Sequence, residues 1–326
     1  MTVESGFDAL QQEVDVPTDV LEAARARRDV FVTVLPTADE VQKVRRSGSL
    51  KRGTHKDPLH DVDLIVVYHA DRHPDWGQPG QSAEESLRRT SALASQFLGP
   101  EAGQAETVRL TRLQNHAVKC FLDDPEDPDA FTVDLTPALV RREGGFWIPQ
   151  RNDGIWVPTD PQVLEDQVAA RHAAWRQFAK LVRLLKRWNA DHGDVMKSLV
   201  VEVLALDHLP ATDRPEALAR FFTAGSAAVW RPIVDPAGLC GEIQPDLDKA
   251  AAHAALSAAA DGAWQAVNDD ARGEERAAMC GWREVFGPIY PQPEGGCSGG
   301  TGKGAAFVAP AFVPSSPRKV AYIEQG

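Results

Sequence analysis

Apolar positions in the first half of the chain follow mainly the period of strands, with stretches of helical period between them. The clearest strand is the β-branched run from Val62 to Tyr68, which is typical of a buried strand. Further strands are predicted at 116–122 and 131–135, and helices at 18–34 and 83–97. These elements predict a mixed sheet with helices packed against it.

From about residue 166 the apolar positions recur at helical spacing instead. One apolar stripe is formed by Trp175, Phe178, Leu181, Val182, Leu185 and Trp188. Another apolar helix is predicted to begin at Ser198. The end of the chain is rich in Gly, Pro and Ser, which predicts a flexible tail. The expected division is a sheet domain with an N-terminal helix at 1–165, a helical domain at 166–292 and the tail at 293–326.

The composition suits a chain that buries a sizeable core in two domains, with 326 residues of which 43% are hydrophobic and 25% charged. The N-terminus has no basic region followed by an apolar one, and no stretch reaches the roughly 18 apolar residues of a membrane span. We therefore expect a cytoplasmic protein. The cysteines are widely spaced and form no CxxC motif, which predicts free thiols. They are Cys120, Cys240, Cys280 and Cys297.

The formal net charge of −12 argues against a protein whose main role is non-specific binding to nucleic acid. One basic cluster stands out, formed by Lys43, Arg45, Arg46, Lys51, Arg52 and Lys56. It either attracts a triphosphate or a polynucleotide activator, or it is a solvated basic face that balances neighbouring acids. The sequence leaves both interpretations open.

The strongest candidate for chemistry is the combination of Gly48-Ser49 with Asp61 and Asp63, the two motifs being separated by eleven residues. Alternation along a strand puts both aspartates on one face. Two carboxylates about 4 Å apart repel by about 4 kcal/mol at an effective dielectric of about 20, so a cation or a raised pKa is expected there. Glycine lets the backbone approach a phosphate closely, and serine offers a hydroxyl and an N–H. Taken singly, each motif is equally well a surface turn or a pair of solvated acids.

A third carboxylate, Asp134, lies in a second strand-like run that is expected to end at Pro137. Magnesium prefers one or two carboxylates together with substrate phosphates to a site made of protein alone. The set of Asp61, Asp63 and Asp134 therefore predicts a site for two Mg²⁺ ions, which Mn²⁺ can replace. By itself, Asp134 is equally an ordinary acid at a strand edge.

Together these motifs resemble the nucleotidyltransferase superfamily that contains DNA polymerase β, and within it the bacterial cGAS/DncV-like nucleotidyltransferases (CD-NTases), relatives of oligoadenylate synthetase. The matching segments are GSLKRGT at 48–54, DVDLIVV at 61–67, VDLTPA at 133–138, GIWVPTDP at 154–161, KLVRLLKRWN at 180–189, KSLVVEVLA at 197–205 and WREVFG at 282–287. The resemblance implies an α+β fold in which a polymerase-β-like catalytic core and a C-terminal helical domain form two lobes, with the active site in the cleft.

The resemblance also implies roles for single residues. Asp61 and Asp63 would bind both ions, and Asp134 would complete the site of the ion that activates the attacking ribose hydroxyl. Lys186 and Ser198 would hold the triphosphate tail, and Ser198 also begins a predicted helix, a setting that favours anions. Lys186 by itself is equally a lysine whose stem covers apolar surface. In several relatives an aromatic residue follows the serine, whereas here Leu199 follows it. The sequence therefore does not identify the bases of the nucleotide substrates.

The implied function is template-independent synthesis of a cyclic di- or trinucleotide second messenger from nucleoside triphosphates, with release of pyrophosphate, in bacterial anti-phage signalling of the CBASS type. The resemblance implies a downstream effector that binds the product and an E1/E2-like partner acting at Gly326. One alternative is a linear nucleotidyltransferase that modifies an RNA end or a protein. Another is an inactive nucleotide-binding scaffold, which the retention of Gly48, Ser49 and the aspartates disfavours.

Overall fold

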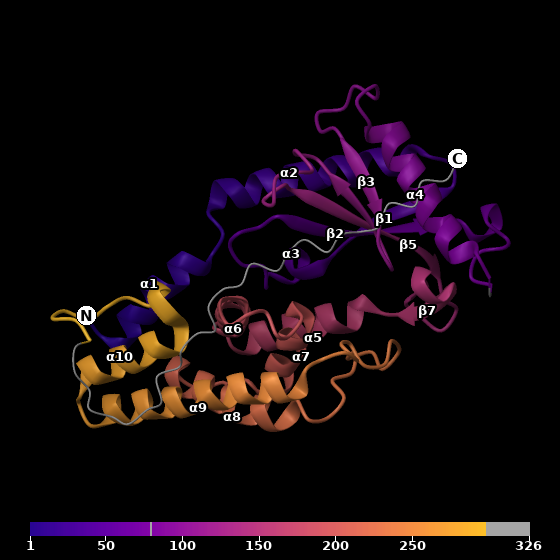
Figure 1. Ribbon diagram of the computed structural model, residues 1–326. Coiled ribbons are helices and arrows are strands. Elements are labelled where there is room, and N and C mark those ends of the chain that lie inside the picture. Colours follow the sequence, from indigo (N-terminus) through magenta and orange to yellow (C-terminus); the bar gives the residue numbers. More distant parts are fainter. Residues whose placement is uncertain (79, 298–326) are drawn as a thin grey trace.

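The computed structural model describes residues 1–78 and 80–297, in which a mixed sheet lies beside a group of helices (Figure 1). The sheet order is β1-β2-β5-β4-β3, with β6 paired to β5 and β7 paired to β6. β2 and β5 run parallel, while the other paired strands are antiparallel. The strands are β1 (Val41–Ser47), β2 (Asp61–Tyr68), β3 (Leu110–Leu113), β4 (Val118–Phe121), β5 (Thr132–Val140), β6 (Phe146–Gln150) and β7 (Ile155–Thr159).

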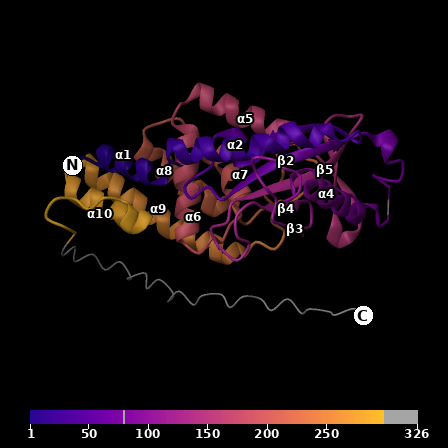
Figure 2. The same ribbon diagram turned by 90° about the horizontal axis from the view of Figure 1, so that it is seen from above.

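One face of the sheet is covered by α2 (Thr18–Val34) and α4 (Ser82–Leu98), as Figures 1 and 2 show. Phe31 of α2 and Leu87 of α4 pack in one core with apolar residues of β2 and β5. Both helices were predicted from the sequence, α2 with the same bounds and α4 within one residue at each end. Since this face is buried, the opposite face of β2 is the one that carries the aspartates.

The strand that carries Asp134, β5, is longer than predicted, because Pro137 does not end it. β5 continues to Val140, and Pro137 pairs in register with Val66 of β2. On the other side of β5, the β4 ladder ends at Leu135 and the β6 ladder begins at Leu139. Pro137 thus lies between the two antiparallel ladders, where no hydrogen bond from its backbone nitrogen to β4 or β6 is required. The strand therefore tolerates proline at this position.

The second part of the described chain is helical, as predicted. It contains α5 (Pro161–Ala174), α6 (Phe178–Asp191), α7 (Ser198–His208), α8 (Arg214–Ala228), α9 (Lys249–Ala271) and α10 (Glu275–Phe286). The expected stripe lies on α6 and is buried in the core of this part, with Phe178, Leu181 and Trp188 at most 1% exposed. Its first member, Trp175, precedes α6 and is only partly buried. Of the helices in residues 1–78 and 80–297, none has the length and apolarity needed to cross a membrane.

The first helix of the chain, α1 (Val3–Val14), does not pack with the sheet. It lies beside α10 at the end of the helical part (Figure 1). Phe7 makes edge-on contacts with Trp282 and Tyr290, and the Tyr290 hydroxyl donates to the Val3 carbonyl at 3.1 Å. Residues 3–14, which were predicted to belong to the sheet domain, thus pack with the helices, and the predicted boundary at 165 falls inside α5. The apolar face of α1 is what attaches it to the helices.

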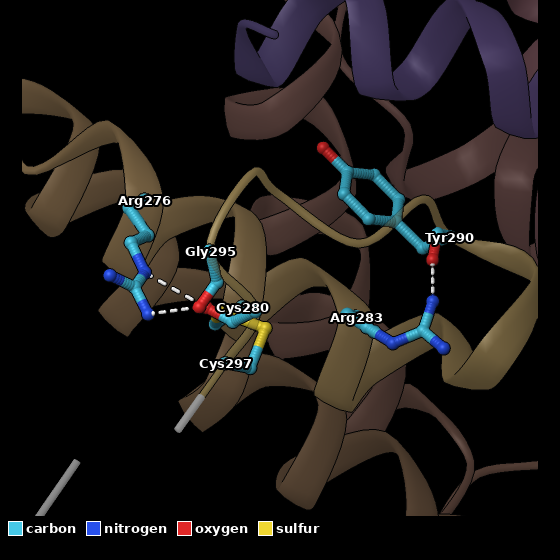
Figure 3. The surroundings of a disulfide bond; sticks show 7 residues. Arg276, Cys280, Arg283, Tyr290, Gly295 and Cys297 are labelled. Atoms are coloured by element: carbon cyan, nitrogen blue, oxygen red, sulfur yellow. Dashed lines mark hydrogen bonds between the residues drawn. A yellow bond between two sulfur atoms is a disulfide. The ribbon is translucent and has the colours of Figure 1, made fainter. Parts of the chain in front are cut away.

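The expectation of free thiols is also wrong for one pair, because Cys280 and Cys297 form a disulfide (Figure 3). Arg276 of α10 holds the same segment, donating to the carbonyls of Gly295 and Gly296 at 2.7 and 2.8 Å. Widely spaced cysteines gave no sequence signal, since the chain must turn back after α10 before they meet. Cys120 and Cys240 are free thiols, as expected. The rest of the predicted tail, including Gly326, lies outside the described residues.

Removal of the disulfide by Cys280→Ser is expected to lower the free energy of unfolding by about 3 kcal/mol, because a bond across 17 residues restricts the unfolded chain. Urea denaturation under oxidising conditions measures this difference. The same comparison in dithiothreitol is the control, where both proteins are reduced and their midpoints should coincide. Equal midpoints under oxidising conditions would show that the bond does not form in solution.

Candidate active site

The turn between β1 and β2 brings Gly48 against the predicted aspartates. β1 runs directly into the short helix α3 (Gly48–Arg52), and Gly48 has a φ of +74°, which favours glycine. A Cβ atom placed on Gly48 would lie 1.8 Å from Oδ2 of Asp63. The backbone of this turn therefore packs directly on a carboxylate, and only glycine leaves room for both.

A polar row crosses the sheet at the level of Asp63. In register, Ser47 of β1 lies opposite Asp63, Asp63 opposite Asp134, and Asp134 opposite Lys119 of β4. Directly opposed residues point to the same face of a sheet, and Asp61 shares this face because it lies two residues before Asp63. The fold thus brings Asp61, Asp63 and Asp134 together on one face, as the sequence predicted.

These carboxylates are in an environment that disfavours their negative charge. Burial raises the pKa of Asp63 to about 7, and the nearby charges of Asp61 and Asp134 add to the shift. Burial likewise raises the pKa of Asp134 to about 6, although Lys119 acts against it with its ammonium 3.6 Å from Oδ1. This Oδ1 atom is buried and has no hydrogen-bond partner in the described structure. A buried carboxylate oxygen that accepts no hydrogen bond, beside two like charges and only one ammonium group, fits a bound cation.

No group of three or more His, Cys, Asp or Glu side chains in residues 1–78 and 80–297 is arranged to hold a metal ion by itself. For magnesium this is an ordinary situation, because its site is usually completed by water and by phosphates of the substrate. The residues present therefore fit an ion that arrives with a nucleotide better than a resident structural metal.

A cavity of about 460 Å³ opens in front of the aspartates and is walled on the other side by the helical part. From the sheet side it is lined by Gly48, Ser49, Asp61 and Asp63, and from the helical side by Lys186, Ser198, Leu199 and Glu202. Ser198 is exposed and is the first residue of α7. Asp134 adjoins Asp63 in register but is not among the residues that line the cavity. All the other predicted site residues thus face one space.

Lys186 lies in the wall of this cavity, with its ammonium group already engaged. Its Nζ donates to Oε2 of Glu202 at 2.7 Å and to the carbonyl and hydroxyl of Thr54 at 3.1 and 3.3 Å. The residue is only 4% exposed. The sequence offered two alternatives for Lys186, a phosphate ligand or a lysine whose amine stays in water. In the structure the amine is buried and hydrogen-bonded to Glu202 and Thr54, so neither alternative describes it fully.

Glu202 and Arg52 belong to the same group, and their pairing was not predicted. Arg52 binds the Glu202 carboxylate through two nitrogens, at 2.6 and 3.2 Å, and Glu202 is fully buried. Burial raises the pKa of Glu202, but the charges of Lys186 and Arg52 outweigh it and lower the pKa to about 2. A sequence signal existed, because Glu202 is the single charged residue in the apolar run from Ser198 to Leu206 and stands one helical turn after Ser198.

Comparison with known proteins gives a consistent result, although no family model matches the chain. The chain is 21% identical to a probable cyclic nucleotide synthase of Bacillus cereus (strain VD146), over 90% of this chain and 99% of that protein. Among solved structures it is similar to E. coli MS115-1 CdnC with ATP, at a TM-score of 0.69 and 19% identity, covering 89% of this chain and 99% of CdnC. The chain has the fold of the CD-NTases.

Other CD-NTase structures agree with this assignment. The complex of E. coli MS115-1 CdnC with HORMA-deltaN matches at a TM-score of 0.67 and 19% identity, over 89% of this chain and 98% of that one. The GTP-bound form of Vibrio cholerae DncV matches at 0.53 and 13% identity, over 88% and 86%. The predicted fold, a mixed sheet with flanking helices and a C-terminal helical part, is confirmed. The roles given to single residues stay predictions.

In this CD-NTase fold the basic cluster near α3 is split up. Arg45 pairs with Glu165 at 2.9 Å, and Arg46 pairs with Asp29 at 3.1 Å. Arg52 and Lys56 line the cavity, whereas Lys43 and Lys51 do not. Part of the cluster thus balances neighbouring acids, and part of it faces the site where a triphosphate is expected.

Replacement of Gly48 by alanine is expected to displace Asp63 and to reduce nucleotide turnover about a hundredfold or more, because misplacing a reacting group by about 1 Å has that effect. Gly53→Ala is the matched control, since Gly53 has a φ of +71° but a Cβ there meets nothing within 4 Å. It introduces the same backbone strain, about 1–2 kcal/mol, without the clash. Equal turnover in the two variants would show that contact with Asp63 does not matter.

Proposed function

We propose that the protein is a template-independent nucleotidyltransferase that joins nucleoside triphosphates and closes the product into a cyclic di- or trinucleotide, with release of pyrophosphate. The observation that carries this proposal is that Asp61 and Asp63, next to Asp134, face Ser198 of the helical part across one cavity, which Arg52 of α3 also lines. Carboxylates on one side and phosphate-binding groups on the other suit a nucleoside triphosphate with its metal ions.

The proposed roles follow from the arrangement of the site. Asp61 and Asp63 would hold two Mg²⁺ ions, or Mn²⁺ in their place, and Asp134 would complete the site of one of them. Such ions supply Lewis-acid stabilisation of the attacking ribose oxygen and of the leaving pyrophosphate. The Asp134 Oδ1 atom without a hydrogen-bond partner and the raised pKa values of Asp63 and Asp134 support this assignment.

On the helical side, the Ser198 hydroxyl and its N–H at the start of α7 would donate to the triphosphate. Lys186 and Arg52 would contribute positive charge from the cavity wall, held in place by Glu202. Glu202 thus acts as a positioning residue that fixes the direction of both cations. Most of the proposed rate enhancement comes from such positioning and charge neutralisation.

The wider role proposed is that of a bacterial anti-phage signalling enzyme of the CBASS type, located in the cytoplasm, whose product binds a downstream effector. The curated relative is named a probable cyclic nucleotide synthase, which supports a cyclic product. One similar structure is a complex of CdnC with HORMA-deltaN, which supports a protein partner for this chain as well. Conjugation at Gly326 by an E1/E2-like partner and activation by a nucleic acid stay predictions.

The test is to incubate the purified protein with all four α-labelled ribonucleoside triphosphates and Mg²⁺ or Mn²⁺, then with phosphatase. A small phosphatase-resistant product, absent from an Asp61→Asn, Asp63→Asn double variant, is the expected result. Omission of one label at a time identifies the bases. Label found only in added RNA or protein would establish the linear alternative, and nucleotide binding without any product would favour an inactive scaffold.

A further inference from the structure

A second cavity, of about 600 Å³, lies behind the wall of the first one, between the junction of α1 and α2, the end of α3, and helices α5 and α6. Its titratable lining residues are predominantly basic. They are Arg52, His55, His172, Arg176, Lys180 and Arg183, with Asp15 as the single acid. For a chain with a formal net charge of −12, this local excess of positive charge is unusual.

The positive charge of this cavity is only partly neutralised. The Asp15 carboxylate neutralises only Arg183, because its Oδ1 accepts hydrogen bonds from Arg183 at 2.7 Å and from Gln11. Arg176 and Lys180 are exposed and form no ion pair within the described part of the chain. Two cationic side chains therefore border the cavity without an acidic partner.

Two histidines that line the same cavity each have one ring nitrogen without a partner. The Nδ1 atoms of His55 and His172 are buried and make no hydrogen bond in the described structure. Burial lowers the pKa of His55 to about 4, helped by the charge of Arg183, and burial and Arg176 lower the pKa of His172. Buried polar atoms without partners are uncommon in proteins, and these two belong to side chains that line the cavity.

The remaining lining residues are apolar and mostly small: Val16, Leu21, Ala169, Ala173 and Ala179. The three alanines, which come from α5 and α6, are called the alanine floor below. We propose that this cavity binds a small phosphate-bearing organic molecule, with its phosphate near Arg176, Lys180 and Arg183 and its body on the alanine floor. Arginine and lysine side chains both bind phosphate, arginine through two parallel N–H groups and lysine as a point charge.

The wall between the two cavities is shared. Arg52 and His55 line both of them, Gly53 accepts from Arg183 at 2.8 Å, and Thr54 accepts from Lys186 at 3.1 Å. A ligand in the second cavity that binds Arg183 or Arg52 therefore contacts residues that are hydrogen-bonded to the segment 53–54 or adjoin it. The same segment accepts a hydrogen bond from Lys186. If both sites bind ligands, each changes the affinity of the other by the same factor. This coupling rests on the proposed function, whereas binding in the second cavity does not.

The test is calorimetric titration of the full chain with adenosine 5′-monophosphate and, separately, inorganic phosphate, in the absence of divalent metal. Wild type is expected to bind the nucleotide, and an Arg176→Ala, Lys180→Ala double variant at least about tenfold more weakly, since two charge-assisted contacts are lost. An Arg142→Ala, Arg231→Ala double variant is the matched control. Both of its arginines are exposed and form no ion pair among the described residues, and it should bind like wild type.

An Asp63→Asn variant should lose synthesis and keep this binding, because Asp63 lines the first cavity and not the second. Unchanged binding in the Arg176→Ala, Lys180→Ala variant, or loss of binding in Asp63→Asn, would overturn the proposal. So would a wild-type Kd weaker than about 10 mM, the sign of an adventitious ion only. Equal affinity for inorganic phosphate would support the phosphate site and overturn the role of the alanine floor. Unfolding midpoints of all variants verify that they fold.

Discussion

Asp63→Asn is expected to lower the rate of nucleotide joining about a thousandfold or more, while the protein stays folded. Asp63 lies between Asp61 and Asp134 and touches the Gly48 turn, so its carboxylate is central to the proposed site. Loss of one preorganised charged group in such a site typically has an effect of this size. Asparagine keeps the shape of the side chain and removes one of several crowded like charges, so the metal-free variant should be at least as stable as wild type.

The measurement is the initial rate of pyrophosphate release with Mg²⁺, together with the urea midpoint of each protein. Asp75→Asn is the control, because Asp75 is exposed and forms no ion pair in residues 1–78 and 80–297. It should behave as wild type in both assays. Retention of most of the turnover by Asp63→Asn would remove the aspartates from the mechanism and with them the proposed function.

Glu202→Gln is expected to lower the free energy of unfolding by about 3 kcal/mol, the lower end of the range for breaking a buried ion pair. Glu202 is fully buried and holds both Arg52 and Lys186, so glutamine leaves two cations in the wall without a countercharge. Urea denaturation at neutral pH measures the difference. Glu242→Gln is the matched control: Glu242 pairs with Lys249 at 3.4 Å but is partly exposed, and its loss should be worth less than about 1 kcal/mol.

The effect of Glu202→Gln should also depend on pH in a defined way. The pKa of Glu202 is lowered from 4.5 to about 2, so its charged form stabilises the folded protein, fully above about pH 5. As the pH falls towards 2 this contribution is lost in wild type, and the difference between wild type and the variant should shrink. A difference that stays the same from pH 7 to pH 3 would contradict the assignment of Glu202 as the charged partner of Lys186 and Arg52.

Much of the site was predictable because the relevant signals are local. Asp61 and Asp63 share a face through the two-residue period of a strand, and the Gly48-Ser49 turn precedes them closely in the chain. The bounds of α2 and the apolar stripe of α6 follow from helical periodicity in the same way. The CD-NTase resemblance rests on such short motifs, and the comparison of structures confirmed its fold.

The pairing of Glu202 with Arg52 and Lys186 was not predictable from local signals. Arg52 and Glu202 are 150 positions apart, and their contact depends on how the helical part lies against the sheet part. The single charge in the apolar run of α7 indicated that Glu202 is special, but it did not indicate a partner. The same holds for the second cavity, whose basic residues come from α3, α5, α6 and the segments that follow α3 and α5, and meet only in the folded chain.

What the sequence determined by itself, then, is the position of α2, α4 and β2, the apolar stripe of α6 and the aspartate face, since each depends on a period of two or 3.6 residues within one segment. The tertiary structure alone decided that α1 packs on α10, that Cys280 meets Cys297, and that the amine of Lys186 is engaged by Glu202. Each of these depends on contacts between distant segments. Such contacts form through the burial of apolar surface, which is non-directional and therefore leaves no spacing rule in the sequence.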